Sequence, residues 1–472
     1  MNEQTEPHES EPEPEPEDVP ASEPVSTPPG RVRRWWRPVL AVVGLLFAAF
    51  FFVVYQHVLT IQQKPSWPPT AGAITAAGAQ AATERFAARS DPKPADVGMP
   101  YGWSTAATIE PWPEGKNFFP KIFADVEAAR SSVHILMFGW REGEIGTKMT
   151  DLLIKKIKQG VEVRVIVDGQ GSQVFGPAGP MFTRLADAGA QIVVNDLLPW
   201  DEDGLYPDHR TFDWTQDDVG HADHRKLYVI DGIVAWTGGA GLEDHFENGQ
   251  FHDVMVRVTG NVVRQAQALF LMSFRAHGGP LPADLSKYFP AQPNPGTVPT
   301  ALLQVTPSGF QSATQAIRAL IDHARTRLDI MNPYFTDADM VQRVIAAAKR
   351  GVKVRIVVSA TSNNPQATAA FKYHYAALIK AGAQIWEYPG AVVHAKLVVA
   401  DTTVVFGTVN FDAWALYRNY EVAMMARSAA AATLFEERVF GPDIARSHPG
   451  TPPTGLGARF KDWLWDKLAY FL

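Results

Sequence analysis

The feature that most limits how this chain can fold is an internal duplication. "ARSSVHILMFGW" (129–140) corresponds to "ARTRLDIMNPYF" (324–335), and "KQGVEVRVIVDG" (158–169) corresponds to "KRGVKVRIVVSA" (349–360). "AGAQIVV" (188–194) then corresponds to "AGAQIWE" (381–387), so three segments recur in the same order. A repeat of this size indicates two copies of one supersecondary unit. The chain therefore has to form two related lobes.

Each copy alternates helical and strand patterns. "MTDLLIKKIKQG" (149–160) has apolar residues at helical spacing and ends at a glycine, and "VEVRVIVDG" (161–169) follows as a short β-branched strand. Alternating β and α units predict an α/β fold in which mixed or mainly parallel sheets are flanked by helices.

A histidine and a lysine occur at the same place in both copies. In each copy the order is histidine, one residue, lysine, four apolar residues, aspartate and then a glycine-containing turn. In an extended strand the histidine and the lysine, two residues apart, leave the same face. An imidazole beside an ammonium is an awkward structural pair, but the pair is suited to surround a phosphate. The six residues are His224, Lys226 and Asp231 in the first copy and His394, Lys396 and Asp401 in the second.

Charge and cysteine content narrow the chemistry. The chain has no cysteine, which excludes disulfides, thiolate nucleophiles and cysteine zinc sites. The formal net charge of −7 comes largely from nine acidic residues within 1–30, and the rest of the chain is close to neutral. Nucleic-acid binding calls for clustered Lys and Arg, so a nucleic-acid partner is not favoured.

The N-terminal part predicts a membrane anchor. Residues 39–55 contain no charged or polar side chain, and a spanning helix needs about 20 predominantly apolar residues. Four arginines precede this run and only Lys64 follows closely, so the positive-inside rule places the N-terminus in the cytoplasm and the large domain outside it. We therefore expect a single-pass protein of the cell (inner) membrane with an extracytoplasmic catalytic domain.

The paired motifs resemble those of the phospholipase D superfamily, and within it the bacterial cardiolipin synthases. The likeness covers roughly residues 115–445, and its closer form is carried by "HRKLYVIDGIVAWTGG", "FHDVMVRVTGNVV" and "GTVNFDAWALYRNYEVAMM". The resemblance implies a duplicated fold with one site at the lobe interface, where both histidines meet one phosphodiester. It also implies that no metal or other cofactor is needed and that no obligate dimer is required to complete the site.

The resemblance also assigns roles. One histidine would form a phosphohistidine while the other acts as general acid and base, and the lysines would hold the phosphoryl oxygens. His224 matches the nucleophile and His394 the acid and base. One orienting carboxylate is expected in the strand after each motif, and the motif aspartates are expected to be structural. The candidate catalytic set is His224, Lys226, Asp231, His394, Lys396, Asp401, Asp253 and Glu421, and the candidate phosphate-binding residues are Gly239, Thr408 and Asn410.

The chain departs from the family pattern in several places. Gly241 stands where the family has asparagine, and five residues rather than six separate Asp401 from Gly407. An acidic insertion, 201–223, has no counterpart in the second lobe. It could be a substrate loop with Ca²⁺ or a solvated insertion, and we favour the latter. The aromatic C-terminus could lie in the membrane interface or pack on the body, and the sequence leaves both open.

The sequence thus predicts a membrane-anchored phosphatidyltransferase of cardiolipin synthase type, with phosphatidylglycerol as the favoured phospholipid substrate. The alternatives are a phospholipase D that hydrolyses phospholipids, an anchored phosphodiesterase or nuclease, and a lipid-binding relic without activity. The expected segments are an acidic tail and basic flank (1–37), a transmembrane helix (38–61), a linker (62–114), lobe 1 (115–290), lobe 2 (291–445) and an amphipathic tail (446–472).

Overall fold

A computed structural model describes residues 42, 44–45, 73–174, 176–195 and 221–469. The chain divides into two units, 1–59 and 60–472. The predicted transmembrane helix (38–61) lies outside the described residues except for Val42, Gly44 and Leu45, and the tail before it lies wholly outside them. Among the described residues no helix combines the length and apolar character that crossing a bilayer requires. The following paragraphs concern the second unit.

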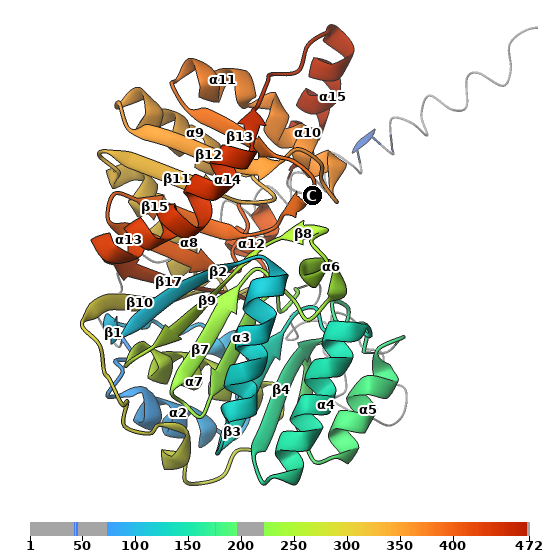
Figure 1. Ribbon diagram of the computed structural model, residues 1–472, viewed down its shortest axis with the longest axis vertical. Helices are drawn as coiled ribbons and strands as arrows, with labels where there is room; N and C mark the ends of the chain where they lie inside the picture. The colour runs from blue at the N-terminus through green and yellow to red at the C-terminus, as the bar shows by residue number, and fades with distance from the viewer. Residues whose placement is uncertain (1–41, 43, 46–72, 175, 196–220, 470–472) are drawn as a thin grey trace, which may run out of the picture. The chain divides into compact units, whose positions relative to one another are not determined.

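Lobe 1 is built on a seven-stranded sheet with the strand order β2-β9-β7-β6-β3-β4-β5. Helices α3, α4 and α5 cover one of its faces (Figure 1). The strands are β2 (Thr108–Pro113), β3 (Ser132–Met137), β4 (Glu162–Asp168), β5 (Gln191–Asn195), β6 (Lys226–Ile230), β7 (Val234–Gly238) and β9 (Val254–Thr259). The helices are α3 (Gly115–Ala128), α4 (Glu144–Lys158), α5 (Gly179–Asp187), α6 (Asp244–Glu247) and α7 (Val262–Ala276).

Lobe 2 repeats this plan around a nine-stranded sheet with the order β1-β10-β17-β16-β15-β11-β12-β13-β18. The strands are β1 (Ser104–Ala106), β10 (Val298–Val305), β11 (Arg327–Met331), β12 (Lys353–Ser359), β13 (Gln384–Tyr388), β15 (Lys396–Ala400), β16 (Thr403–Gly407), β17 (Glu421–Arg427) and β18 (His448–Pro449). The helices are α8 (Ser312–His323), α9 (Ala338–Lys349), α10 (Pro365–Tyr373), α11 (Tyr375–Lys380), α12 (Ala413–Tyr417), α13 (Ala429–Phe435), α14 (Gly441–Arg446) and α15 (Leu456–Lys467).

The sheets are mixed, and the expectation that they are mainly parallel is wrong. Only β3-β4-β5 and β11-β12-β13 pair in parallel, and every other pair within the two sheets is antiparallel. The reason lies in the motif itself. The turn after β6 begins at Asp231 (φ 51°) and Gly232 (φ 64°), and this left-handed backbone returns the chain as a hairpin to β7. A hairpin joins antiparallel neighbours, whereas a parallel neighbour needs a crossover.

Part of the expected linker is folded into the body. Residues 79–87 form helix α2 (Ala79–Ala87), which packs on α7. The short strand β1 then joins the sheet of lobe 2, and β2 joins the sheet of lobe 1. One connecting segment therefore supplies an edge strand to each lobe and ties the two sheets together.

The two lobes share a hydrophobic core. One cluster of buried residues lies between the lobe 1 sheet and its outer helices, and another lies between the lobe 2 sheet and α8 and α9. A third cluster takes side chains from both sheets, among them Leu227 of β6 and Leu397 of β15, and includes nearly the whole of α7. Since the inner faces of both sheets are buried in this common cluster, neither lobe could keep its inner face dry alone.

Candidate active site

The two histidines are held where the lobes meet. Each lies two positions before a lysine that opens a central strand: Lys226 opens β6 and Lys396 opens β15. The backbone N–H of His224 donates to the carbonyl of Tyr420 at 3.0 Å, and that of His394 donates to the carbonyl of His252 at 2.7 Å. Both acceptors belong to the opposite lobe. The predicted convergence of both motifs at one interface is therefore present in the geometry.

A short parallel pair reinforces the contact at the second histidine. Strand β8 (Phe251–His252) of lobe 1 pairs with β14 (Val392–Val393) of lobe 2. Close by, the ring of His252 stacks on Tyr388 and its Nε2 lies 2.8 Å from Asp443 Oδ2, so backbone and side chains both cross the interface.

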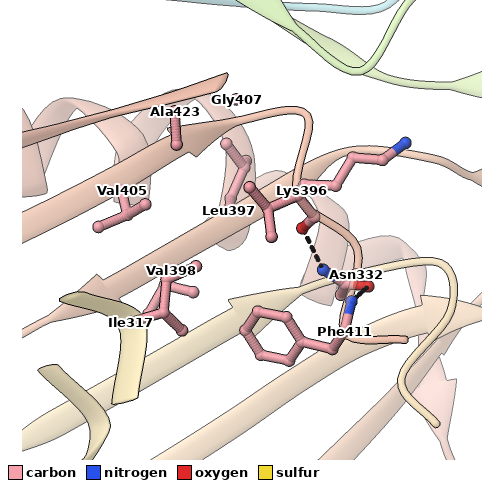
Figure 2. Close-up of a pocket in the computed structure, with 10 residues that line it drawn as sticks. Ile317, Asn332, Lys396, Leu397, Val398, Val405, Gly407, Phe411 and Ala423 are labelled. Carbon is pink, nitrogen blue, oxygen red and sulfur yellow. Dashed lines mark hydrogen bonds between the residues drawn. The ribbon is translucent and has the colours of Figure 1, made fainter. Parts of the chain in front are cut away.

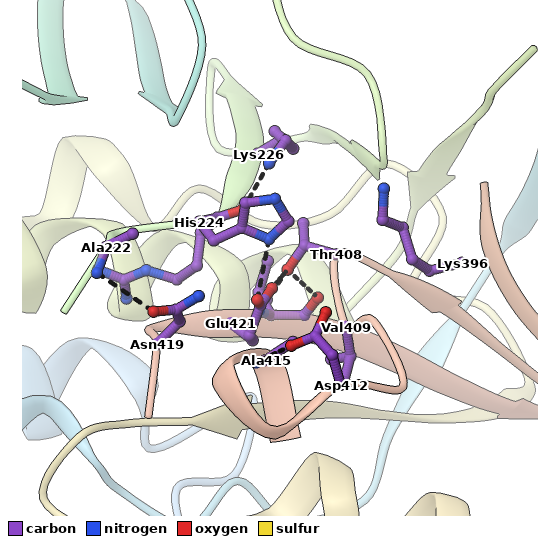
Figure 3. Close-up of polar contacts among 12 residues, drawn as sticks. Ala222, His224, Lys226, Lys396, Thr408, Val409, Asp412, Ala415, Asn419 and Glu421 are labelled. Atoms are coloured by element: carbon purple, nitrogen blue, oxygen red, sulfur yellow. Dashed lines mark hydrogen bonds and ion pairs between the residues drawn. The ribbon is translucent and has the colours of Figure 1, made fainter. Parts of the chain in front are cut away.

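The orienting carboxylates are exchanged between the lobes. Glu421 of lobe 2 lies 2.9 Å from Nδ1 of His224, and Asp253 of lobe 1 lies 2.8 Å from Nδ1 of His394 (Figure 3 shows the first pair). Both carboxylates are fully buried. The expected partners, Asp253 for His224 and Glu421 for His394, are therefore wrong, because each carboxylate lies at or next to the start of a strand that meets the opposite lobe. In both pairs the carboxylate engages Nδ1 of the ring rather than Nε2.

Two residues predicted to bind phosphate instead hold these carboxylates. The N–H of Gly239 donates to Asp253 Oδ1 at 3.2 Å, and the hydroxyl of Thr408 bonds to Glu421 while accepting from the N–H of Val422. A side chain at position 239 would collide with Asp253, because a Cβ there would lie 2.4 Å from Oδ2. Phosphate contacts from Gly239 and Thr408 stay a prediction, and the contacts present are those of groups that position the carboxylates.

The two lysines place positive charge beside the imidazoles. Lys226 Nζ donates to the carbonyl of His224 at 2.7 Å, and Lys396 Nζ donates to the carbonyl of His394 at 2.5 Å and lies 3.1 Å from its Nε2. Burial is the largest cause that lowers their pKa values, to about 8 for Lys226 and about 7 for Lys396. A bound anion would offset that burial, so these ammonium groups are suited to hold a phosphate.

A small, mostly apolar pocket lies beside Lys396 (Figure 2). Asn332 closes one side of it by donating to the carbonyl of Val409 at 3.2 Å and accepting from the N–H of Phe411 at 3.0 Å. Lys396 extends away from the apolar side chains that line the pocket. The pocket is therefore a gap in the packing of the lobe 2 core, and the ammonium group of Lys396 points out of it toward the lobe interface. The lining residues are Ile317, Asn332, Lys396, Leu397, Val398, Val405, Gly407, Val409, Phe411 and Ala423.

Both histidines are held neutral. Burial and then the charges of the two lysines lower the pKa of His224 well below its usual range. Burial and then Lys396 lower the pKa of His394 to about 4. Their partners differ, since burial raises the pKa of Glu421, whereas the bond to His394 and the charge of Lys396 overcome burial and lower the pKa of Asp253. Neutral imidazoles are what a nucleophilic role requires at neutral pH.

The motif aspartates lie at the far ends of the same strands, away from the histidines. Asp231 accepts from the backbone N–H groups of 130, 131 and 132 at 2.7–2.9 Å. Asp401 accepts from those of 325, 326 and 327 at 2.8–3.2 Å. Each therefore ties a hairpin turn to the start of the neighbouring strand, β3 or β11. These contacts are structural, which is the role that we expected within the motif.

Asn410 and Gly241 occupy equivalent turns of the two lobes but different surroundings. Asn410 is buried, and its Oδ1 has no hydrogen-bond partner among the described residues. Gly241 faces the backbone of Gly139, whose carbonyl would lie 2.5 Å from a Cβ at 241. An asparagine at position 241 would therefore have no room in lobe 1. Of these two equivalent positions, only 410 carries a side-chain amide.

The sequence analysis did not identify the aromatic side chains that lie beside the histidines. Phe138 lies edge-on to His224, with ring centroids 4.9 Å apart, and Lys226 Nζ lies 4.6 Å from the same ring. Tyr334 lies edge-on to His394 at 6.3 Å. Both residues follow equivalent strands, in "LMFGW" and "MNPYF", but the repeats align Phe138 with Pro333 and Tyr334 with Gly139, so the alignment does not pair the two aromatics.

The sequence analysis also did not identify Asp412. It caps α12 by accepting from the N–H of Ala415 at 2.8 Å, and burial raises its pKa to about 7.

Residues 201–220 of the acidic insertion lie outside the described residues. Asp223, the last residue of the insertion, is buried and accepts from Nε and Nη2 of Arg225, at 2.7 and 2.6 Å.

Comparison with known proteins agrees with this geometry. A family model described as "Cardiolipin synthase, PLD-like domain" matches residues 122–272 and 317–440, more than half of the chain. Cardiolipin synthase 1 of Bacillus cereus is 28% identical over 323 residues, which cover 65% of this chain and 61% of the relative. The major cardiolipin synthase of Bacillus subtilis (strain 168) is 27% identical over 322 residues, 66% of this chain and 63% of the relative. The matches thus span less than two thirds of these relatives' length.

Among solved structures, phosphatidylserine synthase of Haemophilus influenzae Rd KW20 aligns with a TM-score of 0.60 at 14% sequence identity. The alignment covers 78% of this chain and 97% of that one, and at this identity it shows a common fold. The family model spans both histidine motifs and both orienting carboxylates. This chain therefore belongs to the PLD-like domain family of the cardiolipin synthases.

Proposed function

We propose that this protein is a membrane-anchored phosphatidyltransferase of cardiolipin synthase type that works through a phosphohistidine intermediate. The observation that carries the proposal is the crossed arrangement of two neutral histidines, each oriented by a carboxylate of the other lobe and each beside a lysine. Two imidazoles and two ammonium groups around one point match the needs of an in-line exchange at phosphorus. The names of the matched relatives support the choice of a phospholipid substrate.

In the first half of the reaction, Nε2 of His224 attacks the phosphorus of phosphatidylglycerol. The P–N bond forms as the P–O bond to the head-group glycerol breaks, and His394 gives its proton to the departing glycerol oxygen. Glu421 at Nδ1 stabilises the positive charge that develops on the His224 ring. The products of this half are free glycerol and phosphatidyl-His224.

In the second half, the roles of His394 reverse. It takes the proton from a hydroxyl of a second phosphatidylglycerol, and that oxygen attacks the phosphohistidine. The P–N bond breaks, His224 returns to its neutral state, and the product is cardiolipin. Asp253 holds Nδ1 of His394 in both halves, so Nε2 carries the proton each time.

The binding of the substrate anion adjusts the protonation of the cluster. In the free protein His394 has a pKa of about 4, which is low for a general acid. A phosphodiester beside it adds a negative charge, which favours the protonated imidazole and both charged lysines. The substrate thereby creates the acid that its own cleavage requires.

The proposal is tested by one assay of the purified full chain in vesicles of phosphatidylglycerol, with products resolved by mass spectrometry. The expected products are cardiolipin and glycerol in equal amounts. Phosphatidic acid in place of cardiolipin would make the protein a phospholipase D. Absence of both, with a folded protein, would contradict the proposed function.

The pH dependence of the reaction follows from the lysines. We expect kcat/KM for a water-soluble short-chain phosphatidylglycerol to fall as pH rises through about 7 to 8, because Lys396 and Lys226 lose the charge that binds phosphate. At the acid end the rate should fall as the nucleophile His224 becomes protonated, at a pH well below the usual range for a histidine because burial and the neighbouring lysines lower its pKa. A phosphodiester does not titrate in this range. A profile that stays level from pH 6 to about 10 would contradict a role for lysines with lowered pKa values.

A further inference from the structure

The exposed apolar surface of the body is concentrated in one place. Within residues 73–469, the large hydrophobic side chains that the structure shows as exposed all lie on α10, α11 and α15. Helices α10 and α15 pack side by side, and α11 follows α10 directly (Figure 1). Exposed apolar side chains gathered on neighbouring helices mark an interaction site more often than scattered ones do. We call this group the α15 patch; it comprises Tyr373, Ile379, Leu456, Phe460, Trp463 and Leu464.

Helix α15 is oriented opposite to an ordinary surface helix. Its two acidic residues face the body: Asp462 is 3% exposed, and Asp466 lies 2.6 Å from Nε2 of His374 at the end of α10. Its apolar residues face outward, with Leu456 88% and Phe460 62% exposed. A helix that packs only on its own protein buries its apolar face instead. The ion pair with His374 fixes α15 in this inverted orientation.

The exposed charged residues of the patch are cations. On α15 they are Arg459, Lys461 and Lys467, and the two acids of the helix face the body, where Asp466 pairs with Lys467 at 2.9 Å and Asp462 lies 3.7 Å from Lys461. Helices α10 and α11 carry no acidic residue and add Lys372, which pairs with Glu387 of β13 at 3.1 Å, and the exposed Lys380. Exposed aromatic and aliphatic side chains edged by cations are complementary to the surface of an anionic bilayer.

The patch is connected to the rim of the candidate site. Helix α10 begins directly after Asn364, its N-cap. The neighbouring Asn363 bonds to the hydroxyl of Tyr334, and the Tyr334 ring lies edge-on to His394. Only the length of α10 therefore separates residues beside a reactive histidine from the exposed aromatics.

We propose that the α15 patch docks the catalytic body on an anionic phospholipid surface, with Phe460 and Trp463 inserted at the level of the lipid head groups. This contact is separate from the predicted N-terminal anchor. It would present the site to lipid in the bilayer, whereas the anchor alone would only keep the body near the membrane. The inference goes beyond phosphatidyl transfer and does not depend on it.

The absence of cysteine makes a direct test possible, because one introduced thiol gives one labelled position. Phe460→Cys on α15 and Ala346→Cys on α9, both exposed, are labelled with an environment-sensitive fluorophore in the full chain reconstituted into vesicles. We expect the label at 460 to be quenched by lipids that carry a shallow nitroxide in vesicles containing phosphatidylglycerol, at the roughly 5–10 Å depth of interfacial helices. Quenching should be much weaker in pure phosphatidylcholine and absent at 346.

A label at 460 that stays accessible to aqueous iodide in both lipids would overturn the proposal. Shielding that depends on protein density rather than on lipid charge would also overturn it, because a second copy or another protein would then cover the patch. Neither readout needs turnover, so a failure here is distinct from a failure of the proposed function.

A functional variant adds an independent measurement. Replacing Phe460 and Trp463 together with serine should lower the turnover of vesicle phosphatidylglycerol by about tenfold or more, since two buried aromatic side chains are lost from the contact. Turnover of a short-chain substrate below its micellar concentration should be unchanged. An equal loss on both substrates would show damage to the body itself and contradict the docking role.

Discussion

Replacing His224 with alanine should reduce phosphatidyl transfer by at least about 10³-fold, because the group that forms the covalent intermediate is lost. The fold should survive, since the contacts of the His224 side chain, among them the Nδ1 bond to Glu421 and the edge contact with Phe138, are few, and its backbone N–H still reaches Tyr420. The measurement is the initial rate of cardiolipin formation in phosphatidylglycerol vesicles, together with the denaturation midpoint.

The matched control is His323→Ala. His323 is an exposed histidine at the end of α8, and its Nδ1 interacts with the carbonyl of Ala319 in its own helix. Its replacement should leave the rate unchanged. A His224→Ala protein that is folded and retains more than a tenth of the rate would end the phosphohistidine mechanism.

Replacing Asp253 with asparagine should lower kcat by roughly 10²- to 10⁴-fold, as when an orienting carboxylate is removed from a histidine in other enzymes. Asp253 does not touch the substrate in this mechanism; it positions His394 across the lobe boundary. The asparagine amide can donate to Nδ1, which places the proton of the neutral imidazole on Nε2 and prevents that nitrogen from accepting the proton of the incoming hydroxyl. The carboxylate that stabilises the imidazolium form of His394 is lost as well. KM should change much less than kcat, because the lysines remain in place.

A purely structural role for Asp253 predicts another result. Asp253 Oδ1 also accepts from the N–H groups of Gly239 and Val254, so the asparagine variant could lose stability as well. The conservative Asp253→Glu variant retains a carboxylate and should recover part of kcat, and the alkaline limb of the pH profile should persist in it. If the asparagine variant loses stability in proportion to its rate while KM and kcat fall together, the positioning role is wrong.

Much of the site could be recognised in the sequence because its spacing is local. A histidine and a lysine two residues apart share a strand face in any strand, and an aspartate that follows the lysine after four intervening residues falls at the hairpin that ends the strand. Because the chain is duplicated, the same motif occurs twice at equivalent positions, which makes a chance match much less probable. The repeated short-range pattern therefore identified His224, Lys226, His394 and Lys396, while their meeting at one interface was implied by the family resemblance.

The strand directions were predicted less well for a related reason. The alternating pattern of helix and strand is present only in β3-β4-β5 and β11-β12-β13, and those are the parallel pairs. The remaining strands are joined mostly by short turns, and a reading based on periodicity weighed the helices more than the Asp-Gly turn after β6.

The sequence by itself determined the duplication, the two motifs and the family resemblance, because each depends on residue type and short-range spacing, and the resemblance in turn implied the orienting carboxylates. Only the tertiary structure decided that Glu421 serves His224 while Asp253 serves His394, since this exchange depends on how β17 and β9 meet the opposite lobe. It also decided the orientation of α15. A helical wheel separates apolar from acidic residues, but the ion pair between Asp466 and His374, 92 residues apart, turns the acidic side inward. Contacts between residues so distant along the chain form only once the chain is folded.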